Sequence, residues 1–412
     1  MSKLAVLLLV SLSLTAAKVR YDGYEVLRID VESDLQLKVM DKLNTADEFD
    51  FWNFPRDLMV SPEQAPEVKY LLEEHGIPYK VWIPDVQAKI DSMSTSQASA
   101  GFYNSYKTYD EIAQWVKEKA TTYSSIAQDF VFSESSYEGR ELRALKISGG
   151  TGTDKPVIWI EGGIHAREWI SPATVMFITD ELLADYSKDG EVKDLLDTYD
   201  LYVHPLMNPD GYEYTRSDVR MWRKTRAINV NSTCIGVDGN RNFEYEWGGN
   251  GSSSNPCSGS YRGEAPNSEP EVRVVTDYLK NLKSSGRDIA LFLDFHSYGQ
   301  IWLTPYSFTG NFVPPEPDYT EQMTMADAAC AATFNMHGKE YTYGPCGVIL
   351  YEAAGNANDF GYGTVGAVYS FVVELRDNGE HGFLLPEDQI IPTGEETYAG
   401  VRAAFRYLMN KP

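Results

Sequence analysis

A histidine and a glutamate three residues apart, His165 and Glu168, are the first candidates for chemistry in this sequence. An apolar, β-branched run from Val157 predicts a buried strand just before them, and Ser171-Pro172 signals a helix start, with Ser171 as N-cap. The pair therefore lies in a tight strand-to-helix loop, where open α/β sheets bind ligands. An imidazole and a carboxylate at this spacing can chelate one Zn²⁺, and a catalytic site needs one further protein ligand, with water in the fourth position.

Taken alone, the four residues from His165 to Glu168 are a weak sign of metal binding. Such a spacing arises by chance in long chains, and a hydrogen-bonded pair within a loop is the simpler explanation of these residues by themselves. The chain also lacks the His-Glu-x-x-His pattern of the common metalloprotease helix. A third ligand and a base must therefore come from elsewhere in the sequence.

Two polar residues near the ends of apolar runs supply those candidates. His296 follows IALFLDF and Glu374 lies near the end of VYSFVVEL, and both runs predict strands buried on both faces. If the strands are parallel neighbours, His165, His296 and Glu374 emerge at the same edge of the sheet. Ionisable groups there lose hydration unless they are paired or bind a metal, so the sequence now favours the metal site.

The composition is that of a folded protein with more than one domain. The 412 residues are 43% hydrophobic and 23% charged, enough for two or more domains with sizeable cores. The net charge of −24 disfavours nucleic acid and anionic membranes as partners, because both attract basic protein surfaces.

Residues 1–17 have the features of a secretory signal peptide. Lys3 precedes the apolar run LAVLLLVSLSL, and Thr15-Ala16-Ala17 offers small residues for cleavage. A membrane anchor is the alternative, but the run is too short to span a bilayer. We therefore expect a secreted, extracellular protein whose mature chain begins near Lys18.

Residues 18–91 predict a small separate domain. Strands are expected in YEVLRIDV, FDFWNF and YKVWIPDV, and helices in DLQLKVMDKL and PEVKYLLEEHG. This order predicts an α+β sandwich with helices on one face of an antiparallel sheet. Residues 92–104 follow as a linker, because their Ser/Ala-rich part is small, polar and without periodicity.

A large domain, residues 105–412, alternates helices with buried strands. Thr108 and Glu111 form a capping-box pattern before an amphipathic helix, and a further helix is expected from Pro172 to about Ala184. His204 lies inside a predicted strand, and we interpret it as a satisfied core residue rather than a ligand. The alternation predicts an α/β fold with a mixed, mostly parallel sheet that helices cover on both faces.

Four cysteines in a secreted protein indicate disulfides. Cys234 and Cys257 flank a Gly/Ser/Asn-rich loop, so a local bridge is plausible there. Cys330 and Cys346 would then pair by elimination, and the alternative is that they remain free buried thiols.

The motifs GGIHAREWI, MWRKTR, GVDGNRNF, FHSYGQ, LYEAAG and VVELRD occur in this order along the chain. Together they resemble those of secreted zinc metallocarboxypeptidases of the pancreatic A/B type. The resemblance covers essentially the whole chain, and residues 18–91 are similar to the inhibitory propeptide of that family. It implies a secreted zymogen that, once cut, hydrolyses the C-terminal peptide bond of peptides and proteins.

The resemblance implies one Zn²⁺ per chain, held by His165, Glu168 and His296. Water completes the coordination, and the metal lowers the pKa of that water toward neutrality. Asp238 matches the carboxylate that orients the first histidine, which a ligating imidazole needs to hold its tautomer. Its alternative role is that of a turn residue before Gly239.

Glu374 matches the general base, which takes a proton from the water and delivers it to the leaving amine. Its alternative role is an ion pair with Arg376. Arg223 matches the residue that stabilises the oxyanion of the tetrahedral intermediate. Its alternative role is that of one charge in a solvated basic run, MWRKTR.

An exopeptidase must also recognise a free α-carboxylate. Arg241, beside Asn240, matches the residue that does so, and its planar guanidinium suits bidentate binding. Tyr351 matches a mobile tyrosine that closes over the bound C-terminus, although ordinary core packing would also explain a tyrosine. Further substrate-binding residues implied by the resemblance are Arg167, Ser297 and Tyr298. The implied partners are peptide C-termini, the chain's own propeptide as inhibitor and an activating protease, with the protein a monomer.

The sequence departs from the family at the specificity pocket and at the activation site. Asn358 stands where A-type enzymes have an aliphatic residue and B-type enzymes an aspartate, so we expect a preference for neutral C-terminal residues. Other residues expected to line this pocket are Ser307, Cys346 and Leu350. No basic residue lies between Lys89 and Lys107, so trypsin-like activation would use one of these two, or another protease cuts within the linker.

Two other classes of protein compete with the enzyme. A catalytically silent, carboxypeptidase-like binding protein would have lost Glu374, Arg223 or a zinc ligand, and all are present. A carboxypeptidase inhibitor would use only the small domain, which leaves the large domain unexplained.

Overall fold

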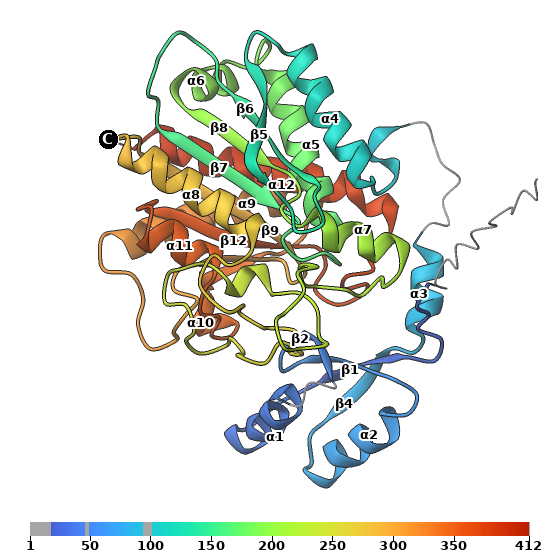
Figure 1. Cartoon of the computed structure of the whole chain (residues 1–412). Coiled ribbons are helices and arrows are strands. Elements are labelled where there is room, and N and C mark those ends of the chain that lie inside the picture. Colours follow the sequence, from blue (N-terminus) through green and yellow to red (C-terminus); the bar gives the residue numbers. More distant parts are fainter. Residues whose placement is uncertain (1–17, 46–48, 94–100, 412) are drawn as a thin grey trace, which may run out of the picture.

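The computed structural model describes residues 18–45, 49–93 and 101–411. The expected signal peptide, residues 1–17, and most of the expected linker lie outside these ranges. The described residues form a small domain, at the bottom of Figure 1, and a large domain above it. Within the described residues, no helix is long and apolar enough to cross a membrane.

The small domain is an antiparallel sheet with strand order β2-β3-β1-β4. Alternate strand residues face opposite sides. Leu27 and Leu58 pack on the helices, whereas Val26 and Met59 belong to the main core of the large domain. The elements are β1 (Glu25–Ile29), α1 (Asp34–Thr45), β2 (Asp50–Asn53), β3 (Asp57–Val60), α2 (Ala65–Glu74), β4 (Tyr79–Ile83) and α3 (Val86–Ser92).

The antiparallel sheet of the small domain is confirmed, but strand β3 and helix α3 were missed. The four residues of β3 are all buried, so they carry no alternating pattern. Helix α3 is short, and its N-cap Asp85 accepts a hydrogen bond from the backbone of Ala88. The sandwich therefore has one more strand and one more helix than the sequence analysis expected.

The large domain is built on an eight-stranded sheet with strand order β11-β10-β12-β9-β7-β8-β6-β5. Four neighbouring pairs are parallel and three antiparallel, which confirms the mixed, mostly parallel sheet. The strands are β5 (Ala127–Ser135), β6 (Glu141–Ile147), β7 (Val157–Gly162), β8 (Asp200–His204), β9 (Ile289–Ser297), β10 (Ile301–Thr304), β11 (Thr342–Pro345) and β12 (Tyr369–Leu375).

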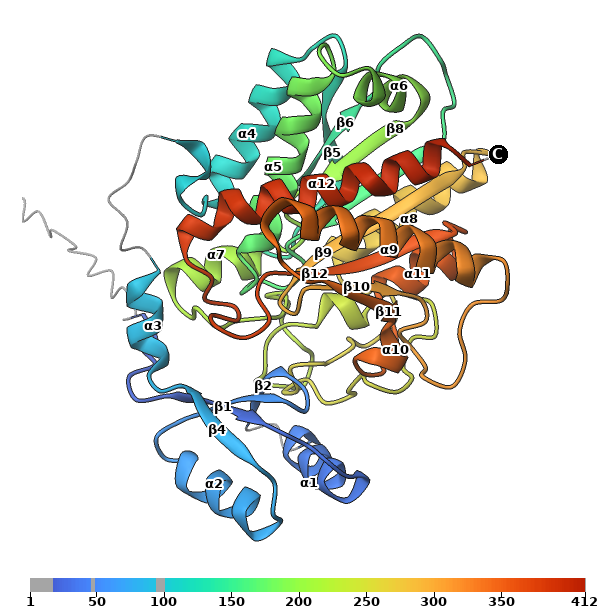
Figure 2. The same cartoon turned by 180° about the vertical axis from the view of Figure 1, so that it is seen from behind.

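Helices cover both faces of this sheet, as Figures 1 and 2 show from opposite sides. One apolar cluster joins alternate strand residues to α4, α5, α6, α9 and α12, and a second joins the remaining strand residues to α8 and α11. The helices of the large domain are α4 (Tyr109–Thr122), α5 (Ile170–Asp185), α6 (Gly190–Thr198), α7 (Pro209–Ser217), α8 (Pro270–Ser284), α9 (Asp318–His337), α10 (Cys346–Ile349), α11 (Ala357–Gly363) and α12 (Ile390–Met409). Short 3-10 turns are η1 (Phe102–Asn104), η2 (Gly239–Arg241) and η3 (Glu387–Gln389).

Two local expectations at helix starts had different outcomes. The capping box of Thr108 and Glu111 is confirmed at the start of α4. The N-cap role of Ser171 is wrong, because α5 begins at Ile170, two residues before the expected start at Pro172, and Trp169 is its N-cap. The Ser171 hydroxyl instead accepts from the backbone of Gly163 at 2.8 Å and donates to the carbonyl of Phe295 at 2.6 Å. It therefore ties the loop after β7 to strand β9.

The cysteines divide into a bridge and two thiols. Cys234 and Cys257 form the expected disulfide. The pairing of Cys330 with Cys346 is wrong, because both are free and buried. Burial raises the pKa of each thiol to about 12, so both remain protonated at neutral pH.

His204, at the end of β8, is a core residue as expected, but its ring is not satisfied. Neither ring nitrogen has a hydrogen-bond partner among the described residues, and the ring centre lies 5.0 Å from that of Phe132. Burial lowers the pKa of His204 to about 3. The folded protein therefore holds this imidazole neutral, whereas the unfolded chain protonates it below about pH 6.5.

We expect His204→Phe to reduce the sensitivity of the fold to acid. Since the folded-state pKa is depressed for a base, the stability that His204 contributes is complete above pH 6.5 and declines as the pH falls toward 3. Urea unfolding of both proteins at pH 7 and pH 4.5 measures this. The loss of unfolding free energy between the two pH values should be smaller in the variant, and an equal loss would contradict the expectation.

Candidate metal centre and substrate cleft

The parallel strands bring the predicted polar residues to one edge of the sheet. In the registers, Gly162 at the end of β7 lies opposite Phe295, and Glu374 lies opposite His296. The loop that follows β7 carries His165 and Glu168 to the same place. Strand order and register thus assemble residues that are far apart in the sequence.

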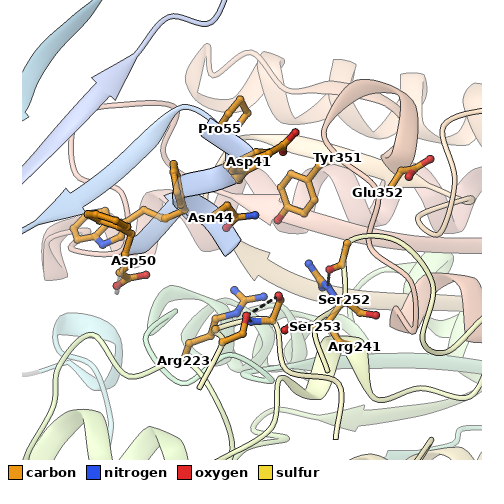
Figure 3. Close-up of a pocket in the computed structure, with 18 of the residues that line it drawn as sticks. Asp41, Asn44, Asp50, Pro55, Arg223, Arg241, Ser252, Ser253, Tyr351 and Glu352 are labelled. Carbon is orange, nitrogen blue, oxygen red and sulfur yellow. Dashed lines mark hydrogen bonds between the residues drawn. The ribbon is translucent and has the colours of Figure 1, made fainter. Parts of the chain in front are cut away.

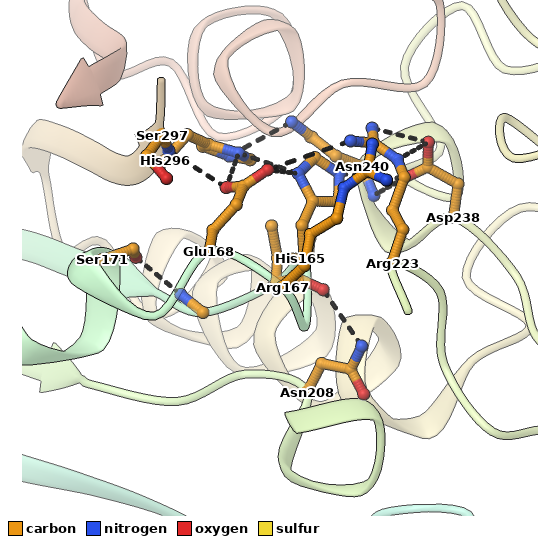
Figure 4. Close-up of polar contacts among 12 residues, drawn as sticks. His165, Arg167, Glu168, Ser171, Asn208, Arg223, Asp238, Asn240, His296 and Ser297 are labelled. Carbon is orange, nitrogen blue, oxygen red and sulfur yellow. Dashed lines mark hydrogen bonds and ion pairs between the residues drawn. The ribbon is translucent and has the colours of Figure 1, made fainter. Parts of the chain in front are cut away.

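His165, Glu168 and His296 form a compact buried cluster, seen in Figure 4. The two Nδ1 atoms lie 3.1 Å apart, and Glu168 oxygens lie 2.8 Å from Nδ1 of His165 and 3.2 Å from Nδ1 of His296. Burial would raise the pKa of Glu168, but the two imidazoles outweigh it and lower that pKa. Two nitrogen donors and one carboxylate that converge in this way suit a zinc ion and leave a coordination position open for reaction.

Asp238 holds the far side of the His165 ring. Its Oδ1 lies 3.0 Å from His165 Nε2, and its Oδ2 accepts from Arg223 Nη2 at 2.9 Å. Burial would raise the pKa of Asp238, but Arg223 and His165 outweigh it and hold the pKa well below its usual range. Asp238 is therefore ionised and can fix the ring orientation and tautomer of His165.

Glu374 faces the same cluster from β12. Its Oε2 is buried and has no hydrogen-bond partner among the described residues. Burial raises its pKa to about 8, and the nearby Glu168 adds to the effect while His296 and Arg223 oppose it. Arg376, the alternative ion-pair partner, bonds to Glu396 and Gln389 instead. Glu374 therefore does not take the alternative role of an ion pair with Arg376.

A cavity of about 960 Å³ opens between the two domains beside this cluster, shown in Figure 3. On the large-domain side it is lined by Arg223, Arg241 and Tyr351. Arg241 is braced by the carbonyls of Gly251 and Asn240, at 2.8 Å each. With Arg167 and Arg262, the cavity lining has four guanidinium groups, and such groups can receive an anionic ligand.

The small domain closes the same cavity from the other side. Asp50 on β2 accepts from Arg167 Nη1 at 2.9 Å, although Arg167 is only 2% exposed. Asp57 on β3 accepts from the Tyr298 hydroxyl at 2.8 Å and from Arg28. Asp50 and Asp57 were missed in the sequence analysis, because nothing local marks a carboxylate that meets its partner more than one hundred residues away.

The remaining predicted substrate-binding residues lie beside the metal cluster, on helix α11 or at the cavity. Ser297 donates its backbone N–H to Glu168 at 3.1 Å, and its hydroxyl is buried without a partner among the described residues. Asn358 is buried on α11, where its Oδ1 accepts from the Ser307 hydroxyl at 2.7 Å. Leu350 lines the cavity between the domains, whereas Asn358, Ser307 and Cys346 do not.

A buried His-Glu-His cluster beside a carboxyl group and a basic cavity, at the carboxyl edge of an α/β sheet, is typical of a metal-dependent enzyme. Comparison with known proteins makes this specific. The zinc carboxypeptidase profile matches residues 112–400, and the carboxypeptidase activation peptide profile matches residues 27–92.

Individual relatives are similar in sequence to this chain along nearly its whole length. Carboxypeptidase A5 of Macaca fascicularis is 37% identical over 98% of this chain and 95% of its own length. Carboxypeptidase B of Rattus norvegicus is 38% identical over 98% of this chain and 99% of its own length. A crystal structure of thrombin activatable fibrinolysis inhibitor superposes with a TM-score of 0.82 at 33% identity, over 94% of this chain and all of that one.

The chain belongs to the zinc carboxypeptidase family and carries that family's activation peptide at its N-terminal end. It is therefore a hydrolase that acts on the C-termini of peptides, and Zn²⁺ is its cofactor. The fold, the class of enzyme and the cofactor inferred from the sequence are confirmed.

Proposed function

We propose that the protein is secreted as a zymogen and that its mature form removes neutral residues from peptide C-termini, with Glu374 as general base. The observation that carries this proposal is the convergence of His165, Glu168 and His296 beside Glu374 and a cavity lined by four arginines. These three residues are the proposed zinc ligands. When bound, Zn²⁺ activates water and polarises the carbonyl of the scissile bond.

Substrate binding is assigned to the basic side of the cavity. Arg241 receives the α-carboxylate in a bidentate geometry, Asn240 donates to it, and Tyr351 closes over it. Arg167, Ser297 and Tyr298 contact residues further from the C-terminus. The backbone contacts that brace Arg241 reduce the freedom that its side chain loses on binding.

Chemistry is assigned to two groups. Glu374 takes a proton from the attacking water and gives it to the nitrogen of the leaving amino acid, so the carboxyl ends the cycle in the protonation state in which it began. Arg223 stabilises the negative charge that develops on the carbonyl oxygen. Its bond to Asp238 holds the guanidinium in place, and Asp238 in turn orients His165.

The activation peptide is the proposed inhibitor in the uncleaved chain. Asp50 accepts a hydrogen bond from Arg167, and Asp57 accepts one from the Tyr298 hydroxyl. In the uncleaved chain these two donors, which we assign to substrate binding, are therefore already bonded to the activation peptide. We assign the signal peptide to residues 1–17, the propeptide to 18–91, the linker to 92–104 and the catalytic domain to 105–412, and we propose that the enzyme is a monomer.

Activation is assigned to a protease that cuts within the linker without requiring a basic residue. Lys89 lies inside helix α3, and Lys107 lies directly before the capping box of α4. Peptide bonds within or next to regular helices fit a protease cleft poorly, which disfavours both lysines.

Glu374→Gln should abolish turnover while leaving zinc bound. Removal of a general base lowers kcat/KM by about 10²–10⁴-fold. The zinc content and the hydrolysis rate of the activated enzyme are measured together. Glu340→Gln, the same change at an exposed residue, is the control and should leave both unchanged. A rate within tenfold of the parent enzyme would contradict the role of Glu374.

A scan of peptides that differ only in the C-terminal residue tests specificity. We expect neutral residues to be released faster than Lys or Arg, because Asn358 has no charge to pair with them. Asn358→Asp should reverse this order by at least about tenfold in kcat/KM, since a carboxylate can pair with a buried basic side chain. Asn410→Asp is the control for net charge. Faster release of basic residues by the unmodified enzyme would contradict the proposal.

Asp50→Asn should raise the activity of the uncleaved chain toward short peptides. It removes the charge from two contacts to a buried guanidinium, and such charge-assisted bonds contribute about 1.5–3 kcal/mol. An increase of about tenfold or more is therefore expected. Asp41→Asn changes a residue that lines the same cavity and serves as the control. Equal activity in the two variants would contradict the inhibitory role of Asp50.

A further inference from the structure

Asp294 is a buried carboxylate that the assignments above do not use. It lies two residues before His296 on β9, so both side chains emerge on the same face of the strand. Its Oδ2 lies 2.6 Å from His296 Nε2, the ring nitrogen that points away from Glu168. Both residues are 1% exposed or less, so solvent does not screen this contact.

A second group competes for the same ring nitrogen. Asn240 Nδ2 lies 3.3 Å from His296 Nε2. The amide orientation of Asn240 is fixed, because its Oδ1 accepts from the backbone of Ala357 at 2.8 Å. The amide nitrogen can only donate and an ionised carboxylate can only accept, so Nε2 cannot satisfy both neighbours in one tautomer.

Metal coordination decides between them. His296 Nδ1 is the nitrogen that faces His165 and Glu168, so Nδ1 supplies the lone pair to a metal. A neutral imidazole then carries its one proton on Nε2. That N–H donates to Asp294, whose contact with Nε2 is the shorter of the two. The Asn240 amide then has no acceptor at His296 Nε2.

We propose that Asp294 is a positioning residue that fixes the tautomer and ring orientation of His296 for zinc, and that it thereby leaves the Asn240 amide free for the substrate carboxylate. The inference rests on the proposed ligand role of His296. It gives this chain a carboxylate behind each ligating imidazole, with Asp238 behind His165 and Asp294 behind His296.

A second buried carboxyl lies beside Asp294. The cross-strand neighbour is Glu161, which lies in register on β7 and accepts from Trp159 Nε1 at 2.6 Å. Burial, with the Asp294 charge adding to it, raises the pKa of Glu161 well above its usual range, so Glu161 keeps its proton. Among the described residues Asp294 has no lysine or arginine partner, which leaves His296 as its counterpart.

The test is the zinc affinity of the full chain, measured by competition with a chromophoric chelator after the metal is removed. Asp294→Asn should weaken zinc binding about 10–100-fold, the usual effect of losing a partner of a ligating histidine. Glu161→Gln is the matched control, because it changes a neighbouring buried carboxyl that is already neutral, and its zinc affinity should stay within about twofold of the parent. An unchanged affinity in Asp294→Asn, or an equal loss in both variants, would overturn the inference.

His296→Ala separates this inference from the proposed ligand set. If His296→Ala keeps the parent affinity, the ligand assignment fails. If His296→Ala loses zinc and Asp294→Asn does not, only the role of Asp294 fails.

A measurement on the unmodified chain covers the case in which Asp294→Asn does not fold. The sequence has six histidines, so nitrogen-15 NMR of the zinc-loaded protein can resolve their ring nitrogens. We expect His296 to show a protonated Nε2 with a strongly downfield proton. An unprotonated Nε2, which would accept from Asn240, would overturn the inference.

Discussion

Strands β7, β9 and β12 run parallel and pair in register, so their carboxyl ends meet at one edge of the sheet. The pairing of Gly162 with Phe295 and of Glu374 with His296 sets the distances within the metal centre. A slip of one residue would turn these side chains to the opposite face. The burial of both sheet faces makes such a slip costly, so the apolar core is what keeps the polar site in order.

The site collects charges that could not be buried singly. The carboxylates of Glu168, Asp238 and Asp294 contact the imidazoles of His165 and His296, and Asp238 also accepts from the guanidinium of Arg223. Each contact lowers the cost of removing its partner from water, and a bound divalent cation lowers it further. Glu374 Oε2 has no hydrogen-bond partner among the described residues, and burial raises the pKa of this carboxyl to about 8.

Carboxylates of the small domain also pair with polar groups of the large domain. Asp50 and Asp57 of the activation peptide pair with Arg167 and Tyr298, and the pair of Asp50 with Arg167 lines the basic cavity. Apolar residues of the small sheet, such as Val26 and Trp52, join the main core of the large domain. The contact between the domains therefore combines apolar burial with two carboxylates, of which Asp50 lines the basic cavity.

Much of the site could be predicted from local pattern. His165 and Glu168 stand in one loop, His296 and Glu374 stand near the ends of apolar runs, and the motifs around Arg223 and Arg241 identified the family. The alternation of helices with buried strands was sufficient for the fold class of both domains. These features depend on residues close together in the chain, and short-range periodicity and spacing express them directly.

Other features depend on contacts that only the folded chain makes. Ser171 binds β9 rather than capping its helix, Cys330 and Cys346 remain apart, and Asp50 meets Arg167 across the domain boundary. Asp294 was not singled out in the sequence, and its contact with His296, which Asn240 also approaches, exists only in the folded chain. The sequence by itself determined most helices and strands and the kinds of side chain available to bind a metal. The tertiary structure decided the pairings, because a hydrogen bond or disulfide between distant segments depends on distances that strand order and packing set.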